Sequence, residues 1–246
     1  MKLTILGSSS AGNAYVLDNG HEALLVECGT PYLSIQKAID FDIGRIRGCV
    51  LSHEHGDHAR HVRRLLNARI SCYMSGGTAE ALRLENHSLV HPVEAFQSRR
   101  LDGFTIQACP VQHDAAEPFG YLIHHEEMGT VLFATDTYYL KYRFDGLSNI
   151  LLECNYRLDI LEANVEAGRI APPQRDRTLR SHMSYDTCRD ALLANDLSRV
   201  NNIVLLHLSP ANSHAADFLQ GIKAATGKNV HIADKGMTID FNKTPF

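Results

Sequence analysis

Short apolar runs alternate along this chain with longer stretches of mixed polarity, and the two kinds of block predict different elements. Aliphatic runs bounded by Gly, Asn or Asp predict strands, whereas apolar positions three and four residues apart predict helices. Strands are expected at residues 3–6, 14–17, 23–26, 70–74, 101–108, 121–123, 130–134, 150–152, 203–206, 230–233 and 237–241. Helices are expected at residues 31–39, 59–67, 77–84, 185–195 and 215–226, and a loose tail at 242–246. This alternation predicts an α/β fold.

Residues with a defined local role mark some of the boundaries. Asp18-Asn19-Gly20 predicts a tight hairpin turn. Ser184 predicts the N-cap of the helix at 185–195, and either Asn212 or Ser213 is the candidate cap of the last helix. The polar residues at 124–127 are expected to lie exposed on a hairpin and outside any site.

The composition fits one large domain over residues 1–246. With 246 residues and 44% hydrophobic content, the chain can bury a substantial core. The net charge of −4 gives no general sign of nucleic-acid binding, although net charge does not describe a local site. The six cysteines form no CxxC pair and are expected to be reduced thiols. No apolar run has the length of a signal peptide or a membrane span, so a cytoplasmic protein is expected.

A dense group of possible metal ligands follows the apolar run Cys49-Val50-Leu51. His53, His55, Asp57 and His58 occupy six positions at the end of a predicted strand, which is where α/β proteins build sites. Imidazole and carboxylate suit Zn²⁺ and other first-row ions, and one tetrahedral ion cannot use so dense a run alone. We therefore expect two metal ions. The alternative is a polar loop whose histidines are only solvated.

The pattern His53-x-His55-x-Asp57-His58 resembles the signature of the metallo-β-lactamase superfamily. The resemblance implies a four-layer αββα sandwich with metals in a cleft at one edge. It extends to three later residues, each beyond an apolar run: His113, Asp136 and His207. The implied first ion is held by His53, His55 and His113; the implied second ion is held by Asp57, His58 and His207, with Asp136 bridging the two. Zn²⁺ is the default for an imidazole-rich site, and Mn²⁺ or Fe would also be accepted.

Three stretches resemble one branch of that superfamily, the YycJ (WalJ)-like group of exonucleases. They are the Gly/Ser-rich residues 7–13, the residues 113–121 and the residues 207–212. Residues 7–13 are either a flexible turn or a lining of the metal site. Glu27 stands where many superfamily members have an Asp that orients a ligand, and its side chain is longer.

Two residues outside the ligand set are candidates for proton transfer. His182 resembles the histidine that, in phosphodiesterases of this fold such as the tRNase Z group, protonates the leaving oxygen together with an acidic residue. Glu153 occupies the comparable acidic position here. An imidazole that titrates near neutral pH suits a general acid, although a structural histidine at a helix start is the alternative.

The resemblance implies a dinuclear metal-dependent hydrolase that shortens DNA from its ends in the 5′-to-3′ direction. Water activated by the two ions, with Asp57, His182 and Glu153 as catalytic residues, would cleave the phosphodiester. Four arginines between Arg169 and Arg180, on an expected loop, could hold a phosphate backbone or could simply be solvated. Alternatives are hydrolysis of a small cyclic phosphodiester, hydrolysis of a lactone, thioester or β-lactam, and a non-enzymatic metal-binding regulatory partner. The oligomeric state is open.

Overall fold

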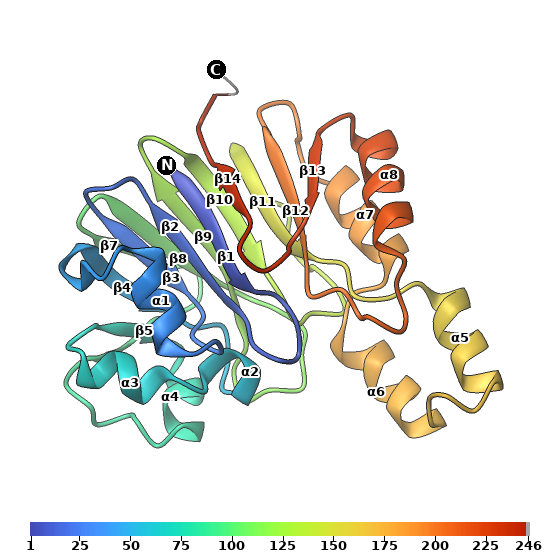
Figure 1. Ribbon diagram of the computed structural model, residues 1–246, viewed down its shortest axis with the longest axis horizontal. Helices are drawn as coiled ribbons and strands as arrows, with labels where there is room; N and C mark the ends of the chain where they lie inside the picture. Colours follow the sequence, from blue (N-terminus) through green and yellow to red (C-terminus); the bar gives the residue numbers. More distant parts are fainter. Residues whose placement is uncertain (245–246) are drawn as a thin grey trace.

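The computed structural model describes residues 1–244 and consists of two seven-stranded sheets packed face to face (Figure 1). The first sheet has the strand order β14-β1-β2-β3-β4-β5-β6, and the second has the order β13-β12-β11-β10-β9-β8-β7. In each sheet an antiparallel half continues into a parallel half, at β3 and β4 in the first and at β10 and β11 in the second. The sheets are therefore mixed and similarly built.

Most of the predicted blocks correspond to an element of the structure, although several elements lie outside any predicted block. The first sheet contains β1 (Lys2–Gly7), β2 (Ala14–Asp18), β3 (Ala23–Val26), β4 (Ile46–Val50), β5 (Cys72–Met74), β6 (Val90–Pro92) and β14 (Thr238–Asp240). The second contains β7 (Ser98–Leu101), β8 (Phe104–Pro110), β9 (Phe119–His125), β10 (Gly129–Ala134), β11 (Leu147–Glu153), β12 (Asn202–Leu206) and β13 (Asn229–Ile232). The helices are α1 (Tyr32–Ala38), the 3-10 turn η1 (Ile43–Arg45), α2 (Gly56–Ala59), α3 (Val62–Asn67), α4 (Gly76–Ala81), α5 (Leu158–Glu166), α6 (Pro172–Ser181), α7 (Tyr185–Leu193) and α8 (Ala215–Thr226).

Three apolar layers hold the four structural layers together. Between the sheets, aromatic side chains such as Tyr15, Phe104 and Phe133 are fully buried, and Tyr15 meets Phe133 edge to face at 5.6 Å. Helices α1, α3 and α4 cover the outer face of the first sheet, and α7 and α8 cover that of the second (Figure 1). Each sheet is covered on both faces, so its central strands are buried along their whole length and are mostly apolar. The predicted αββα sandwich is confirmed.

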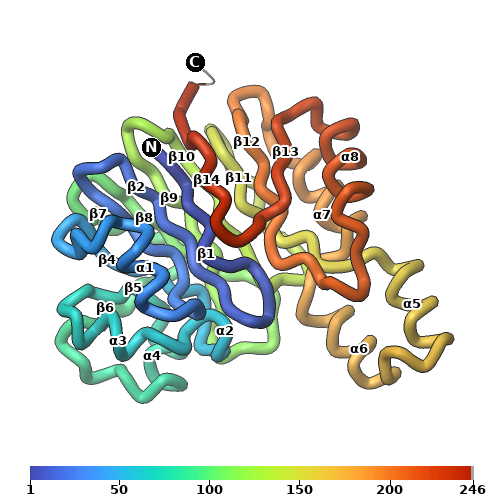
Figure 2. The backbone as a smooth tube through the Cα atoms, viewed as in Figure 1, coloured from blue at the N-terminus to red at the C-terminus, as the bar shows by residue number. Residues whose placement is uncertain are grey.

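The region between β11 and α7 differs from the prediction. A loop was expected over residues 169–180, but α5 and α6 form a helical pair that projects from the sandwich (Figure 2). Pro172 and Pro173 begin α6, where a missing backbone N–H costs no helical hydrogen bond. Within α6 only Ser181 is buried, so the helix lacks the apolar periodicity on which the prediction relied.

Smaller predictions divide into correct and wrong ones. Ser184 caps α7 by accepting a hydrogen bond from the Thr187 N–H, as predicted. The cap of α8 is His214, without a side-chain bond, so neither Asn212 nor Ser213 has that role. The expected helix at 59–67 is divided between α2 and α3, with His58 and Ala59 buried. His125 is buried and was wrongly expected to be exposed.

The chain end is held more firmly than expected. The carbonyl of Asn242 accepts from Asn201 Nδ2 at 2.9 Å, and the Lys243 N–H donates to the Glu127 carbonyl at 2.7 Å. Residues 245–246 of the predicted loose tail lie outside the described residues. All six cysteines are buried and unbridged. Among the helices of residues 1–244, none combines the length and the apolar character needed to cross a bilayer.

Candidate metal and catalytic site

The loops that follow several strands meet at one end of the sandwich. His53 and His55 follow β4, and α2 then carries Asp57 and His58; His113 follows β8, Asp136 follows β10, and His207 follows β12. All seven predicted ligands lie together there, and most of them line a pocket of about 470 Å³. The carboxyl ends of the strands are the side of an α/β sheet on which sites form. The strands therefore position the residues as the sequence predicted.

Asp136 lies at the centre of the group. Its Oδ2 is 3.3 Å from His58 Nε2, 3.6 Å from His113 Nε2 and 3.8 Å from His53 Nε2. Its Oδ1 is 3.1 Å from His207 Nδ1. Burial raises the pKa of Asp136, but His207 and His58 outweigh burial and hold that pKa well below its usual range. The carboxylate therefore stays ionised and faces both halves of the ligand set.

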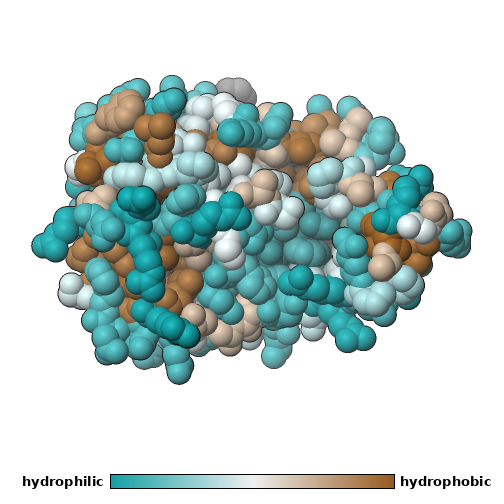
Figure 3. Space-filling view, turned by 60° about the horizontal axis from the view of Figure 1, so that its bottom comes forward, coloured by the Kyte–Doolittle hydropathy of each residue, from teal (hydrophilic) through white to brown (hydrophobic). Residues whose placement is uncertain are grey.

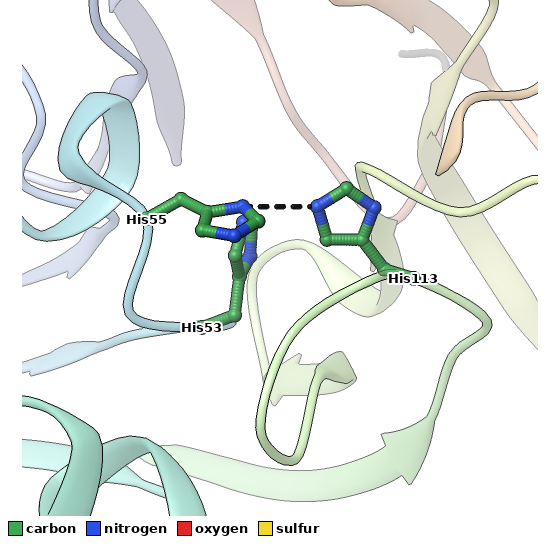
Figure 4. Close-up of side chains that lie close together, drawn as sticks. All are labelled: His53, His55 and His113. Atoms are coloured by element: carbon green, nitrogen blue, oxygen red, sulfur yellow. Dashed lines mark hydrogen bonds between the residues drawn. The ribbon is translucent and has the colours of Figure 1, made fainter. Parts of the chain in front are cut away.

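Three histidines form one half of the group (Figure 4). His53 and His55 come from the loop before α2, and His113 faces them from the loop after β8, with its Nε2 3.1 Å from His55 Nδ1. His113 Nδ1 must donate to the Ser181 carbonyl at 2.9 Å, since a carbonyl only accepts, and this leaves Nε2 free to bind a cation. Burial lowers the pKa of His53 and of His113, and the nearby His58 lowers the pKa of His53 further. Neutral imidazoles are the form that ligates metals.

These residues fit a bound cation. His53 Nε2 is buried and makes no hydrogen bond within the described residues, while Ser52 Oγ, 2.8 Å from Nδ1, fixes the ring. A buried ring nitrogen without a partner is costly unless something else occupies its lone pair. Ligand atoms of His53, His55 and His113 come within 4.8 Å of one another, and so do those of His53, His58 and Asp136. Imidazole and carboxylate donors at this density suit divalent ions of the zinc type.

The other half of the group is supported from the first sheet. Asp57 Oδ2 lies 3.4 Å from His58 Nε2 and 3.8 Å from His207 Nε2. Glu27, fully buried at the end of β3, places Oε2 3.4 Å from His58 Nδ1 and accepts the Ser52 N–H at 3.1 Å. The longer Glu side chain therefore reaches His58 from this position, as an ion-pair contact and not as a hydrogen bond.

Residues 7–13 line the site, as one of the two interpretations predicted. Ser8 Oγ accepts the His207 N–H at 2.9 Å, and Ser10 borders the pocket. The Asn13 amide lies 3.1 Å from His58 Nε2, and the Asn13 N–H donates to the Asp57 carbonyl at 2.7 Å. This segment therefore holds two of the segments that carry ligands, the one with Asp57 and His58 and the one with His207.

Close backbone approach at α2 requires a glycine. A Cβ placed on Gly29 would lie 1.7 Å from the Asp57 carbonyl oxygen, so no residue with a side chain fits at this position. The neighbouring Cys28 N–H donates to the His58 carbonyl at 2.8 Å. The loop after β3 therefore positions α2 and its two ligands.

Left-handed backbone occurs at three site residues. Glu27, Asp136 and His207 have φ values of 65°, 46° and 55°, each directly after or within two residues of a strand end. Such conformations in residues other than glycine cost on the order of 1 kcal/mol or more and persist where surrounding structure imposes them. Here the turn directs each side chain out of the sheet and into the site.

His182 and Glu153 form an ion pair beside the ligands. His182 Nδ1 lies 2.7 Å from Glu153 Oε1, and Glu153 Oε2 accepts the Thr137 N–H at 2.7 Å. Burial lowers the pKa of His182, but the Glu153 carboxylate outweighs burial and raises it to about 9. Because His182 also lines the pocket, it presents a protonated ring to whatever binds there. Glu153 Oε1 is also 3.4 Å from His207 Nδ1, so the pair adjoins the ligand set.

Two supporting residues were missed by the sequence analysis. Asn155 Nδ2 donates to the His207 carbonyl at 2.6 Å, and Thr137 holds Glu153. Their only signal in the sequence is their position. Thr137 comes directly after Asp136, and Asn155 comes two residues after Glu153.

The rim of the pocket is formed by α6. Of the four arginines predicted as a basic stretch, Arg177 lines the pocket and pairs with Asp114 at 3.0 Å. Arg175 is paired with Glu162 at 2.9 Å and Arg169 with Asn164 at 2.7 Å, so these two have structural partners. Figure 3 looks onto this end of the molecule and shows hydrophilic residues across the middle of the face. The opening is therefore polar and accessible.

Comparison with known proteins agrees with this geometry. Residues 24–226 match the family described as the Beta-lactamase superfamily domain. The chain belongs to this superfamily. It is 27% identical to "Exodeoxyribonuclease WalJ" of Streptococcus pneumoniae over 256 aligned residues, which cover 98% of this chain and 92% of that protein. It is 25% identical to "Exodeoxyribonuclease YycJ" of Bacillus anthracis, covering 87% of this chain and 84% of the relative.

A solved structure shows the same fold. The metallo-beta-lactamase fold protein YhfI from Bacillus subtilis superposes with a TM-score of 0.69 at 18% identity, covering 97% of this chain and 99% of that one. The recognised family and the αββα sandwich are thus confirmed, and the chain is a superfamily hydrolase with a His/Asp cluster suited to divalent metals. The division of ligands between two ions stays a prediction.

Proposed function

We propose that this protein is a metal-dependent phosphodiesterase that shortens DNA from an end, in the 5′-to-3′ direction. The observation that carries the proposal is the His182–Glu153 pair at 2.7 Å beside the ligand cluster. Expelling a sugar alkoxide from phosphate benefits from a proton donor, whereas hydrolysis of an activated carbonyl does not need a second protein acid. The exodeoxyribonuclease names of the relatives support the same substrate class.

The ligand roles in this proposal follow the two halves of the cluster. His53, His55 and His113 would hold one ion; Asp57, His58 and His207 would hold the other, with Asp136 shared between them. When bound, two divalent ions acidify a water molecule at neutral pH and neutralise negative charge on a phosphate. Zn²⁺ is the preferred ion for so many imidazoles, with Mn²⁺ or Fe as alternatives.

The chain's own residues supply the proton and the orientation. His182 would donate the proton from Nε2 to the departing oxygen, and Glu153 keeps the ring protonated through Nδ1. Thr137 fixes the Glu153 carboxylate through its N–H at 2.7 Å. Asp57, at the pocket wall, would orient the attacking water. Arg177 at the rim would contact a phosphate next to the cleaved one, as arginine does at nucleic-acid backbones.

The test is an end-labelled duplex assay with the metal-loaded protein. We expect DNA labelled at the 5′ end to lose its label first in the presence of Mn²⁺ or Zn²⁺. The rate at limiting DNA should fall steeply with salt, because each phosphate contact releases a counterion. The Asp57→Ala/His58→Ala protein is the matched control. Cleavage of a small cyclic phosphodiester, a thioester or a β-lactam, with DNA left intact at low salt, would overturn the proposal.

A further inference from the structure

Directly after Asp136 the chain carries an exposed group of aromatic residues. Tyr138 and Tyr139 are 42% and 54% exposed, and Tyr142 is partly exposed. Phe96, 50% exposed, meets Tyr142 edge to face at 5.1 Å from the loop before β7. We call Tyr138, Tyr139, Tyr142 and Phe96 the aromatic ridge. Large apolar side chains are costly to leave in water, so such a gathering marks an interaction surface.

The ridge is fixed to the catalytic site at one end. Thr137 N–H donates to Glu153, and the Thr137 hydroxyl donates to the Tyr139 carbonyl at 2.8 Å. The Tyr138 N–H donates to the carbonyl of Gln112, the residue before His113, at 3.1 Å. The ridge therefore begins two residues after Asp136 in the chain and is hydrogen-bonded to the segments that carry Glu153 and His113.

The other end of the ridge is fixed to the residues that directly follow α7. The Phe144 N–H donates to Asn195 Oδ1 at 2.7 Å, and the Phe144 side chain is buried. Between these two anchors Tyr139, Tyr142 and the surface of α7 border a groove of about 410 Å³. This volume is in the range of ordinary ligand sites.

Basic residues lie between the aromatic ones. Lys141 and Arg143 are exposed, and Lys141 Nζ lies 5.8 Å from the centre of the Tyr142 ring. The acid that borders the groove from α7, Asp190, is paired with Arg189 at 3.0 Å. Rings that stack with bases, alternating with cations that face phosphates, are the composition of surfaces that hold a single nucleic-acid strand.

Resting on the proposed function, we propose that the aromatic ridge is a stacking platform for a single-stranded segment of the nucleic-acid substrate. Bases of the strand stack on Tyr139 and Tyr142, while Lys141 and Arg143 face the backbone. The pocket receives the end being cleaved, and the ridge holds the unpaired nucleotides next to it. The platform is indifferent to base identity because every base offers a flat face.

The test measures binding, so it does not depend on turnover. The metal-loaded protein is titrated into a fluorescent oligothymidylate with a phosphorothioate backbone, which slows cleavage, and anisotropy is read. Replacement of the exposed ring, Tyr139→Leu, should weaken binding about five- to a hundredfold, as loss of one stacked base does. The matched variant Tyr139→Phe keeps the ring and should bind like the original protein.

An abasic strand of the same length separates stacking from other causes. It retains the phosphates but offers no base, so Tyr139→Leu and Tyr139→Phe should bind it equally. Equal affinity of Tyr139→Leu and the original protein for oligothymidylate, or an equal loss on the abasic strand, would overturn the platform.

The same samples distinguish the two proposals. Turnover of bis-p-nitrophenyl phosphate and of duplex DNA by the original protein reports on the proposed function. Ring-dependent binding without any phosphodiester turnover would remove the proposed function and leave the platform standing. Thermal melting of each variant verifies that the fold is intact, and Tyr139 is the safer position because Tyr142 packs against Phe96.

Discussion

Replacing Glu153 with glutamine tests the proton-donor pair with little change of shape. The carboxylate is fully buried and accepts hydrogen bonds from His182 Nδ1 and the Thr137 N–H, both at 2.7 Å. In Glu153→Gln the amide oxygen can still accept from Thr137, but the side chain no longer carries the charge that stabilises protonated His182. We therefore expect the ring to lose its proton near neutral pH.

The size of the effect follows from the pKa of His182. Glu153 contributes most of what raises that pKa from 6.5 to about 9, a preference for the protonated ring on the order of 3 kcal/mol. If the pKa returns to about 6.5, the protonated fraction at about pH 8 falls roughly thirtyfold. Bound divalent cations lower the pKa of a nearby imidazolium. As the pH is raised, the metal-loaded enzyme should therefore lose activity at about pH 9 or at a lower pH, when His182 loses its proton.

The assay compares two leaving groups. DNA releases a sugar alkoxide that needs a proton, so Glu153→Gln should slow its cleavage at least about thirtyfold, somewhat less than the roughly 10²–10⁴-fold expected for complete loss of a general acid. Bis-p-nitrophenyl phosphate releases a stable phenolate and should be affected much less. Glu22→Gln is the matched control, since Glu22 pairs with the buried His125 at 3.1 Å, before β3 and away from the ligand loops. Equal slowing of both substrates by Glu153→Gln would refute the general-acid role.

Three further outcomes are expected. Asp57→Ala/His58→Ala should abolish phosphodiester turnover and lower the metal content in elemental analysis; full metal occupancy would contradict the ligand assignment. Gly29→Ala should destabilise the fold by more than about 2 kcal/mol in urea unfolding, because its Cβ would lie 1.7 Å from the Asp57 carbonyl oxygen; an unchanged midpoint would show that this approach can relax. In metal-free protein His182 should stabilise the fold by on the order of 3 kcal/mol below about pH 6.5, and this contribution should disappear as pH rises through about 9. His182→Asn serves as the reference, and a constant difference between the two proteins over this range would count against the raised pKa.

The sequence predicted that the candidate ligands lie together at strand ends because two signals coincided. Residues such as Asp136 and His207 are polar positions within two residues of the end of runs that are buried on both faces, and such runs stand out by their apolar composition. The resemblance then selected which of the 14 histidines to assign. The strand-end signal alone would not have chosen His113 over the buried His125, which instead pairs with Glu22.

The missed features depend on contacts that no local pattern encodes. Helix α6 buries only Ser181, so its position is set by its packing with α5 and not by an apolar stripe. Arg175 was indistinguishable in sequence from Arg177, yet one pairs with Glu162 and the other borders the pocket. Long-range partners decide between a structural and a functional arginine, and spacing along the chain carries no information about them.

The left-handed backbone at Glu27, Asp136 and His207 has a consequence for protein engineering. Glycine adopts this conformation without strain, so a search for thermostable variants would favour glycine at the very positions where the site needs a side chain. Selection on melting temperature alone would therefore yield proteins that are more stable but have lost their activity. A library intended to retain activity has to hold these three codons fixed and seek its gains elsewhere.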